Sequence, residues 1–170
     1  MGSRLLIRFA RMYTKEFDIR WSDLDANRHL ANSAYINFMS ATRMGFLEQA
    51  GFGHKQFAQL QIGPIIFDEH IYYFKEVFPG RPITVSAELG GRSEDGSLFR
   101  FVHNFYDYKG RNVARGSMAG AWMDLRERKI TTVPQEFMGL YTQLDQTADF
   151  KILTAADTRS HGQVPVDRTL

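Results

Sequence analysis

The sequence predicts an α+β domain in which an antiparallel sheet of about five strands wraps around one long central helix. Three observations support this prediction. Residues 34–50 form a strongly apolar helical segment, an alternating segment at residues 13–20 precedes it, and four strand-like segments separated by short turns follow it. Strands joined by short turns pair in antiparallel fashion. A single sheet can bury so apolar a helix only by curling around it.

The strands are predicted from alternating side chains and from the turns between them. Residues 13–20 place Tyr13, Phe17 and Ile19 on one side and mostly charged residues on the other, which is the period of two of a half-buried strand. Further strands are expected at residues 65–77, 83–89, 99–106 and 113–125, with turns at Pro79-Gly80, Asp95-Gly96 and Lys109-Gly110. Small residues in the last strand, Gly116 and Gly120 among them, indicate that another element packs closely there.

The helix at residues 34–50 is predicted from bulky residues such as Tyr35, Phe38 and Phe46, which recur at intervals of three and four. Gly51 is suited to end it with a left-handed cap, and residues 54–60 are expected to form a short second helix.

The chain is expected to form one domain over residues 1–134. Residues 135–170 are expected to add a C-terminal helix, at 135–144, and a polar tail that packs on this domain or extends from it. The tail shows no clear periodicity, and the sequence contains no internal repeat.

The composition excludes several functional classes. With 21 basic and 19 acidic residues the formal charge is only +2, so no global field favours nucleic acid or a membrane surface. The sequence has 0 Cys, which excludes disulfides and a cysteine nucleophile and is compatible with the cytoplasm, the location we expect. The Leu5-Leu6-Ile7 patch is far too short to span a membrane. No His or acidic residues show metal-ligand spacing, so no metal is expected.

The stretch from residue 21 to residue 35 is the first candidate for chemistry. It packs two carboxylates, an imidazole and two carboxamides into a short loop directly before the helix, and Asn32 and Ser33 are suited to cap that helix. The competing interpretation is that its Asp and Asn residues only form turns and caps. That interpretation is preferred for Asp23, which can also pair with Arg20 or Arg28.

The same loop resembles the active-site loop of hotdog-fold thioesterases. It is similar to the 4-hydroxybenzoyl-CoA thioesterase-like group, and closer to the acyl-ACP thioesterases, whose Asp-x-Asn-x-His-x-x-Asn pattern is matched by Asp25, Asn27, His29 and Asn32. With the order of helix and strands, the resemblance extends over roughly residues 13–134.

The resemblance implies hydrolysis of acyl-CoA, or acyl-ACP, thioesters in a homodimer or a dimer of dimers. Asp25 would act as general base or as nucleophile, backbone N–H groups near Asn32 would form the oxyanion site, and Asn27 and His29 would position groups or handle protons. No cofactor is implied apart from the coenzyme A of the substrate. The substrate-binding candidates are Ser33, Tyr35, Phe38, Pro64, Phe67, Arg92 and Ser93.

Some of these assignments have structural alternatives. Tyr35 and Phe38 are also expected core residues, and Arg92 can be an ordinary turn arginine. His103, between Phe101 and Phe105, is expected to be a structural, half-buried histidine. Glu69 is expected to be solvated or to form a salt bridge, and the alternative is that Glu69 or Asp68 reaches into a partner's site.

Two other functions fit the same fold. Hotdog enoyl-CoA hydratases carry an Asp-x-Asn-Pro-x-His loop, but here the spacing is one residue shorter and the Pro is missing. The third function is a non-catalytic module that binds acyl thioesters, although such a module has no chemical need for the Asp, Asn and His of this loop.

Overall fold

The computed structural model describes residues 12–159 and 162–168, and the Leu5-Leu6-Ile7 patch lies outside them. The strands are β1 (Tyr13–Phe17), β2 (Ile62–Tyr73), β3 (Ile83–Arg92), β4 (Leu98–Tyr106), β5 (Asn112–Asp124), β6 (Lys129–Ile130) and β7 (Gln146–Ile152). The helices are α1 (Asn32–Gln49), α2 (His54–Leu60) and α3 (Gln135–Tyr141), with 3-10 turns at Trp21–Asp23 and Ala155–Arg159.

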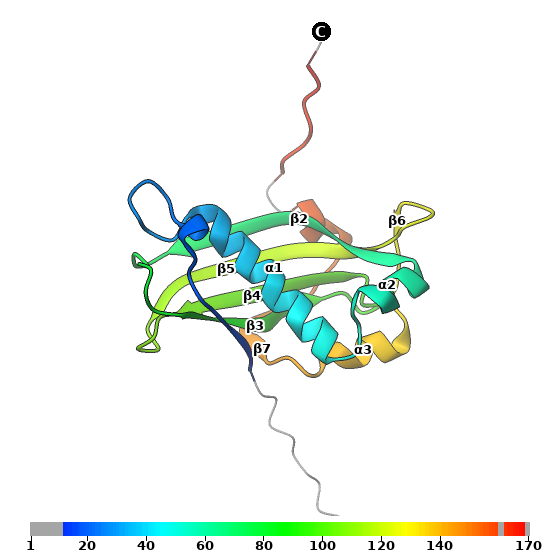
Figure 1. Cartoon of the computed structure of the whole chain (residues 1–170). Coiled ribbons are helices and arrows are strands. Elements are labelled where there is room, and N and C mark those ends of the chain that lie inside the picture. The colour runs from blue at the N-terminus through cyan, green and yellow to red at the C-terminus, as the bar shows by residue number, and fades with distance from the viewer. Residues whose placement is uncertain (1–11, 160–161, 169–170) are drawn as a thin grey trace, which may run out of the picture.

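The main strands form one antiparallel sheet in the order β1-β3-β4-β5-β2, and α1 lies across one face of it (Figure 1). This confirms the predicted sheet wrapped around a central helix. Two strands were not predicted. β6 pairs with the end of β5, and β7, from the polar tail, runs parallel to the end of β3. Backbone hydrogen bonds from Leu89 to Asp145 and from Leu153 to Arg92 flank β7, so main-chain pairing holds it without an apolar pattern.

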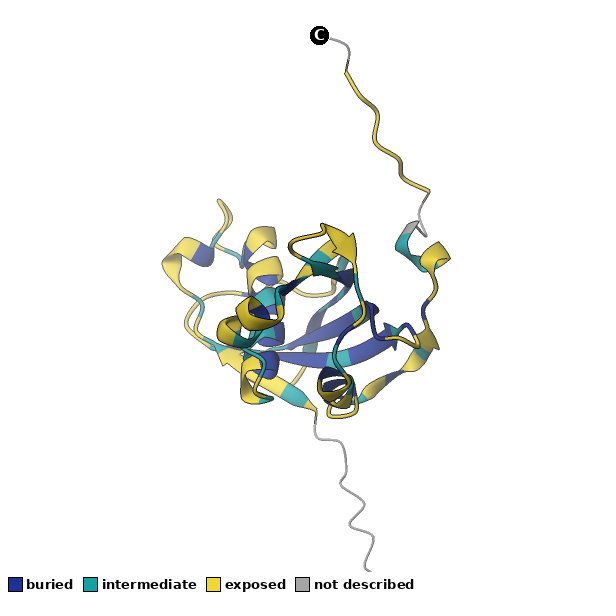
Figure 2. Ribbon diagram, turned by 90° about the vertical axis from the view of Figure 1, so that its right-hand side faces the viewer, coloured by how far each residue is buried: buried dark blue, intermediate teal, exposed yellow. Residues whose placement is uncertain are grey.

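The core lies between α1 and the sheet, where the buried residues concentrate (Figure 2). Phe38 of α1 stacks on Phe17 of β1 with ring centroids 4.5 Å apart, and Met39 is fully buried. A Cβ atom on Gly116 would lie 2.5 Å from the sulfur of Met39. The predicted close approach of the helix to small residues of β5 is therefore confirmed.

One end of the sheet is closed by α3. The Trp122 ring packs against Phe57, Phe99 and Phe137 with centroids 4.6–5.4 Å away. Its Nε1–H donates to the Tyr141 hydroxyl at 2.8 Å, and that hydroxyl donates to the Gly96 carbonyl at 3.2 Å. The indole N–H of Trp122 and the hydroxyl of Tyr141 are thereby both hydrogen-bonded.

Candidate functional site

The loop that contains Asp25 is closed by its own hydrogen bonds. A β-bridge joins Leu24 to Leu30, and the Asp25 N–H donates to the His29 carbonyl at 2.9 Å. The Asp25 carboxylate accepts from the backbone N–H groups of Asn27 and His29 at 2.8 and 2.9 Å, both through Oδ1. Arg28 adopts the left-handed conformation that this tight turn requires (φ 63°). Asp25 is thus held in one place.

If Asp25 only formed a turn, that role would account for the contacts of its Oδ1 atom but not for its Oδ2 atom. Asp107, in the turn between β4 and β5, accepts in the same way from the N–H groups of Lys109 and Arg111, so such turns recur in this chain. Among the described residues, no hydrogen bond engages Oδ2 of Asp25, and the residue is exposed. The turn fixes Oδ1 and leaves Oδ2 available to a ligand or a water molecule.

Helix α1 begins at Asn32, two residues earlier than predicted, and the expected capping role of Asn32 and Ser33 is wrong. The N-cap is Ala31, which has no side-chain acceptor. Its own N–H donates to the Asp23 carbonyl, and the Ala34 N–H donates to Ala31. No hydrogen bond within the described part of the chain uses the N–H groups of Asn32 or Ser33. An uncapped helix start combines free donors with the positive end of the helix dipole.

A hollow of about 360 Å³ brings these features together. Its lining residues come from the loop, the first turn of α1, the last residue of β2 and the segment that follows it: Asp25, His29, Leu30, Asn32, Tyr35, Tyr73, Phe74, Lys75, Glu76 and Val77. Four predicted site residues therefore share one surface. Burial, and to a lesser extent Tyr73, raises the pKa of Tyr35 to about 12, so its hydroxyl stays neutral and able to donate.

Sequence reasoning missed Lys75 and Glu76, which line the same hollow. His29 Nε2 lies 3.9 Å from the Glu76 Oε1, and the imidazole packs edge-on against Phe78 with centroids 4.7 Å apart. Both missed residues lie within residues 65–77, which the sequence predicts as one strand, whereas β2 ends at Tyr73 and leaves them in the segment that follows. Only the fold, through the hydrogen bond from the Leu30 N–H to the Val77 carbonyl, places them beside the loop.

The remaining loop and helix candidates lie outside this hollow. The Asn27 side chain is exposed, and only its backbone N–H contacts Asp25. Ser33 is exposed in the first turn of α1, and Phe38 is buried against Phe17. Asp23 is structural as predicted, because it is buried and accepts from the Arg20 N–H at 2.8 Å and from the Arg20 guanidinium.

The candidates on the strands lie elsewhere. Pro64 lines a second cavity under α1, and Phe67 is exposed where the register of β2 shifts. Arg92 donates to the carbonyls of Ser93 and Glu94. Ser93 donates to Asp95 and accepts from the Leu98 N–H. Both residues serve the turn between β3 and β4, and the structure does not bring them into the Asp25 hollow.

Glu69 and His103 lie inside the fold. Glu69 faces Arg43 across 3.9 Å, so the expected salt bridge is confirmed. His103 is structural as expected but fully buried rather than half-buried, because the sheet and α1 enclose it. Among the described residues, no group of three or more His, Cys, Asp or Glu is placed to hold a metal ion. Within 12–159 and 162–168, no helix is both long and apolar enough to cross a bilayer.

Comparison with known families decides the classification. A family model described as the thioesterase-like superfamily matches residues 19–140, well over half of the chain. The chain belongs to the thioesterase-like superfamily. The match spans the Asp25 loop, α1 and strands β2 to β6, and begins just after β1. Comparison with curated proteins gives no match.

Solved structures similar to this superfamily member include three bacterial proteins. A Staphylococcus aureus protein solved in complex with CoA is 16% identical, with a TM-score of 0.73, and the match covers 93% of this chain and 97% of that one. A 1,4-dihydroxy-2-naphthoyl-CoA thioesterase from Synechocystis is 14% identical, with a TM-score of 0.70 and coverage of 81% and 100%. A DHNA-CoA thioesterase from Staphylococcus aureus is 13% identical, with a TM-score of 0.70 and coverage of 91% and 97%. These similarities confirm the hotdog fold.

Proposed function

We propose that this protein hydrolyses acyl thioesters, with Asp25 as the catalytic carboxylate. The observation that carries the proposal is that Asp25 and the uncapped start of α1 line one hollow. A turn aspartate needs no such neighbour, as Asp107 illustrates. Membership of the thioesterase-like superfamily supports the reaction class.

Two groups at the hollow would carry out the chemistry, namely the backbone N–H at the start of α1 and Oδ2 of Asp25. The N–H group of Asn32, which lines the hollow, stabilises the negative charge that develops on the thioester oxygen, an interaction typically worth about 10²–10³ in rate. Oδ2 of Asp25 either takes a proton from the attacking water or attacks the carbonyl carbon itself, giving a mixed anhydride that water then cleaves. The thiol leaves in both cases. His29, near Glu76, is the candidate general acid that protonates the leaving sulfur.

Coenzyme A is the carrier we propose first, with an acyl carrier protein as the alternative. One similar structure, at 16% identity, holds CoA, and Lys75 supplies a cation at the rim of the hollow. The lack of Cys remains compatible with a cytoplasmic location.

The proposed oligomer is a homodimer formed through β2. This strand ends the sheet order within the described residues. Large apolar side chains are exposed on it and just after it: Ile66, Phe67, Tyr72, Tyr73, Phe74 and Phe78. An apolar edge strand is a template for pairing with another chain, and closed two-fold pairing is the commonest solution in soluble oligomers.

The proposed function is tested by incubating the purified protein with short-, medium- and long-chain and aryl CoA thioesters while free thiol is measured. We expect thiol release from at least one class at rates far above spontaneous hydrolysis. Hydration of crotonyl-CoA without thiol release would instead identify a hydratase. Tight binding of acyl-CoA without either reaction would identify a binding module.

A further inference from the structure

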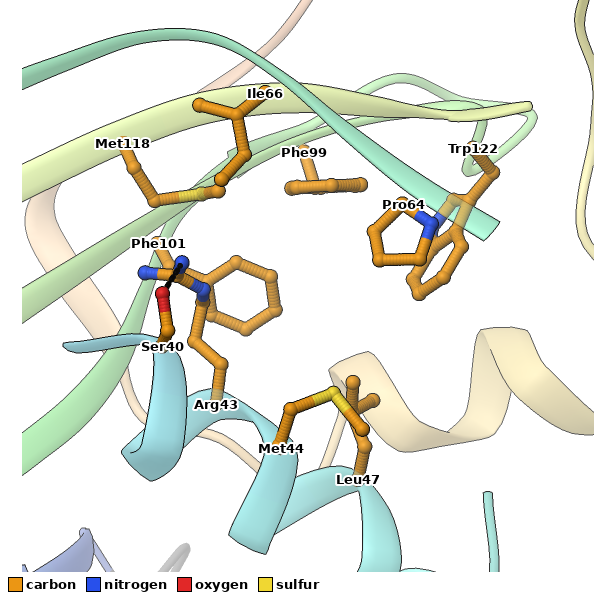
Figure 3. Close-up of a pocket in the computed structure, with 10 residues that line it drawn as sticks. All are labelled: Ser40, Arg43, Met44, Leu47, Pro64, Ile66, Phe99, Phe101, Met118 and Trp122. Atoms are coloured by element: carbon orange, nitrogen blue, oxygen red, sulfur yellow. Dashed lines mark hydrogen bonds between the residues drawn. The ribbon is translucent and has the colours of Figure 1, made fainter. Parts of the chain in front are cut away.

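A second cavity lies between α1 and the sheet, and its walls are mostly apolar (Figure 3). It has a volume of about 170 Å³ and is lined by side chains such as Met44, Leu47, Ile66, Phe99 and Trp122. In other proteins, an apolar cavity of about 150 Å³ admits benzene. This cavity therefore has room for roughly six carbon atoms.

One end of the cavity is polar. Ser40 and Arg43 project into this end from α1, and the Arg43 Nη2–H donates to the Ser40 hydroxyl at 3.1 Å (Figure 3). Arg43 Nη1 lies 3.3 Å from Nε2 of His103, whose Nδ1 lies 2.7 Å from the Ser86 carbonyl. Burial, together with Arg43, lowers the pKa of His103 to about 3. His103 is therefore neutral, with Nδ1–H donating to Ser86 and Nε2 accepting from Arg43.

Arg43 has more donors than these contacts use. A guanidinium carries five N–H groups, and the hydrogen bonds of the described residues engage two of them. Only 7% of the residue is exposed, so the other donors are largely shielded from bulk water. Burial lowers the pKa of Arg43 to about 10, with Glu69 opposing the shift, and the side chain remains a cation at neutral pH.

Glu69 on β2 supplies an acceptor next to Arg43, although it is not itself among the residues that line the cavity. Its Oε1 lies 3.9 Å from Arg43 Nη2, which is too long for a hydrogen bond. This buried oxygen has no hydrogen-bond partner in the described part of the chain. Because Arg43 and Glu69 cancel in charge and His103 is neutral, an anionic ligand group would leave a net buried charge. One hydroxyl can accept from Arg43 and donate to Glu69, and so satisfies both.

The distance from the Asp25 hollow fixes what kind of ligand can reach this cluster. From Asn32 to Ser40 the helix rises about 12 Å, at roughly 1.5 Å per residue. An extended chain covers about 3.6 Å in three bonds, so about 12 Å corresponds to about ten bonds. A single ring attached directly to the thioester carbonyl is too short, whereas an acyl chain reaches the cluster and leaves its tail in the apolar cavity.

We infer that the cavity under α1 binds the distal half of a long acyl chain, and that Arg43 and Glu69 select a chain with a hydroxyl group about ten carbons from the thioester. This inference rests on the proposed function and deepens it by naming the substrate class. The chain runs along α1 from the start of the helix, its hydroxyl binds between Arg43 and Glu69, and about six further carbons fill the space between Met44, Leu47 and Trp122.

The test compares hexadecanoyl-CoA with 10-hydroxyhexadecanoyl-CoA. We expect the wild-type protein to prefer the hydroxylated thioester at least tenfold in kcat/KM, because a site with buried polar groups rejects an analogue that leaves them unpaired. Arg43→Met and Glu69→Met should each reduce this preference toward one, because methionine offers the hydroxyl neither the donors of Arg43 nor the carboxylate acceptor of Glu69. Arg115→Met, at an arginine on β5 that hydrogen-bonds Asn104, should leave it unchanged.

A binding measurement separates this inference from the thioesterase assignment. Calorimetry with free hexadecanoic and 10-hydroxyhexadecanoic acid needs no turnover, so it tests the cavity even if no thioester is cleaved. At least tenfold tighter binding of the hydroxy acid, lost in Glu69→Met, is the expected result. Equal affinity of the wild-type protein for the two acids, or a preference that survives in both variants, overturns the inference.

Discussion

Gly120 should be far less tolerant of a methyl group than Gly116, although both lie on β5. A Cβ atom at Gly120 would fall on the Ile65 carbonyl oxygen of the paired strand and within 2.9 Å of the Phe99 ring. Neither group can move without disturbing the sheet. At Gly116 the Cβ atom would meet the end of Met39, a flexible side chain that can change rotamer.

The expected magnitudes follow from these contacts. Overpacking a core typically costs about 1–3 kcal/mol, so we expect about 1 kcal/mol for Gly116→Ala and about 3 kcal/mol or more for Gly120→Ala. For a chain of this size these values correspond to Tm decreases of about 2–4 °C and about 6–12 °C. Gly139 in α3 is the matched control, because a Cβ atom there meets nothing within 4 Å. Gly139→Ala should stabilise the protein by about 0.5–1 kcal/mol through helix propensity.

The assay is thermal unfolding at one fixed protein concentration, since association would make Tm depend on concentration. Equal Tm values for Gly116→Ala and Gly120→Ala would refute the reasoning. So would a Gly139→Ala variant that is destabilised as much as they are.

Three further predictions concern the interior and the edge of the sheet. The pKa of His103 is about 3 in the folded protein and about 6.5 in the unfolded protein. Between these two pH values the unfolded state binds more protons, so the free energy of unfolding falls as the pH is lowered from 6.5. The loss of stability should approach about 1.4 kcal/mol per pH unit. Urea denaturation from pH 6.5 to 4.5 should show that the stability of His103→Gln depends less steeply on pH than that of the wild-type protein. An identical slope of stability against pH in the two proteins would contradict the burial argument. Tyr141→Phe leaves Trp122 Nε1–H without its buried acceptor and should cost about 1–3 kcal/mol, measured by urea denaturation, and an unchanged midpoint would show that another group accepts this hydrogen. Tyr72→Lys on β2 should convert the proposed dimer to a monomer, measured by light scattering. Tyr108→Lys, at a similarly exposed aromatic in the turn after β4, should leave the dimer intact. A monomeric wild-type protein would contradict the proposed dimer.

The sequence predicted those parts of the fold that depend on local pattern. Alternation located β1, β3 and β4, and the turn at Lys109-Gly110 located the start of β5. The three- and four-residue spacing of Tyr35, Phe38 and Phe46 located α1. It did not predict β7, because this strand is held by main-chain hydrogen bonds around Leu89 and Arg92, and its side chains show no apolar face.

The site was predictable only where its residues are close in sequence. Asp25, His29, Asn32 and Tyr35 lie within a short stretch, and the structure places all of them in one hollow. Glu76 reaches them from the segment after β2, a contact that depends on the pairing of β2 with β5. The start of α1 was misjudged because Asn and Ser favour the N-cap position, whereas here the chain turns earlier, at Ala31.

The most direct test of the account is the activity of Asp25→Asn beside that of Asp107→Asn. Asparagine keeps a side-chain oxygen for the N–H groups that Oδ1 holds at each turn, and replaces Oδ2 by a neutral amide nitrogen. At Asp107 the change also removes the ion pair with Arg111. If Asp25 is the catalytic carboxylate, thiol release from the best CoA thioester falls by about 10²–10⁴ in Asp25→Asn with an unchanged Tm, and stays at the wild-type rate in Asp107→Asn. Wild-type turnover in Asp25→Asn would contradict the central claim and leave Asp25 as a turn residue.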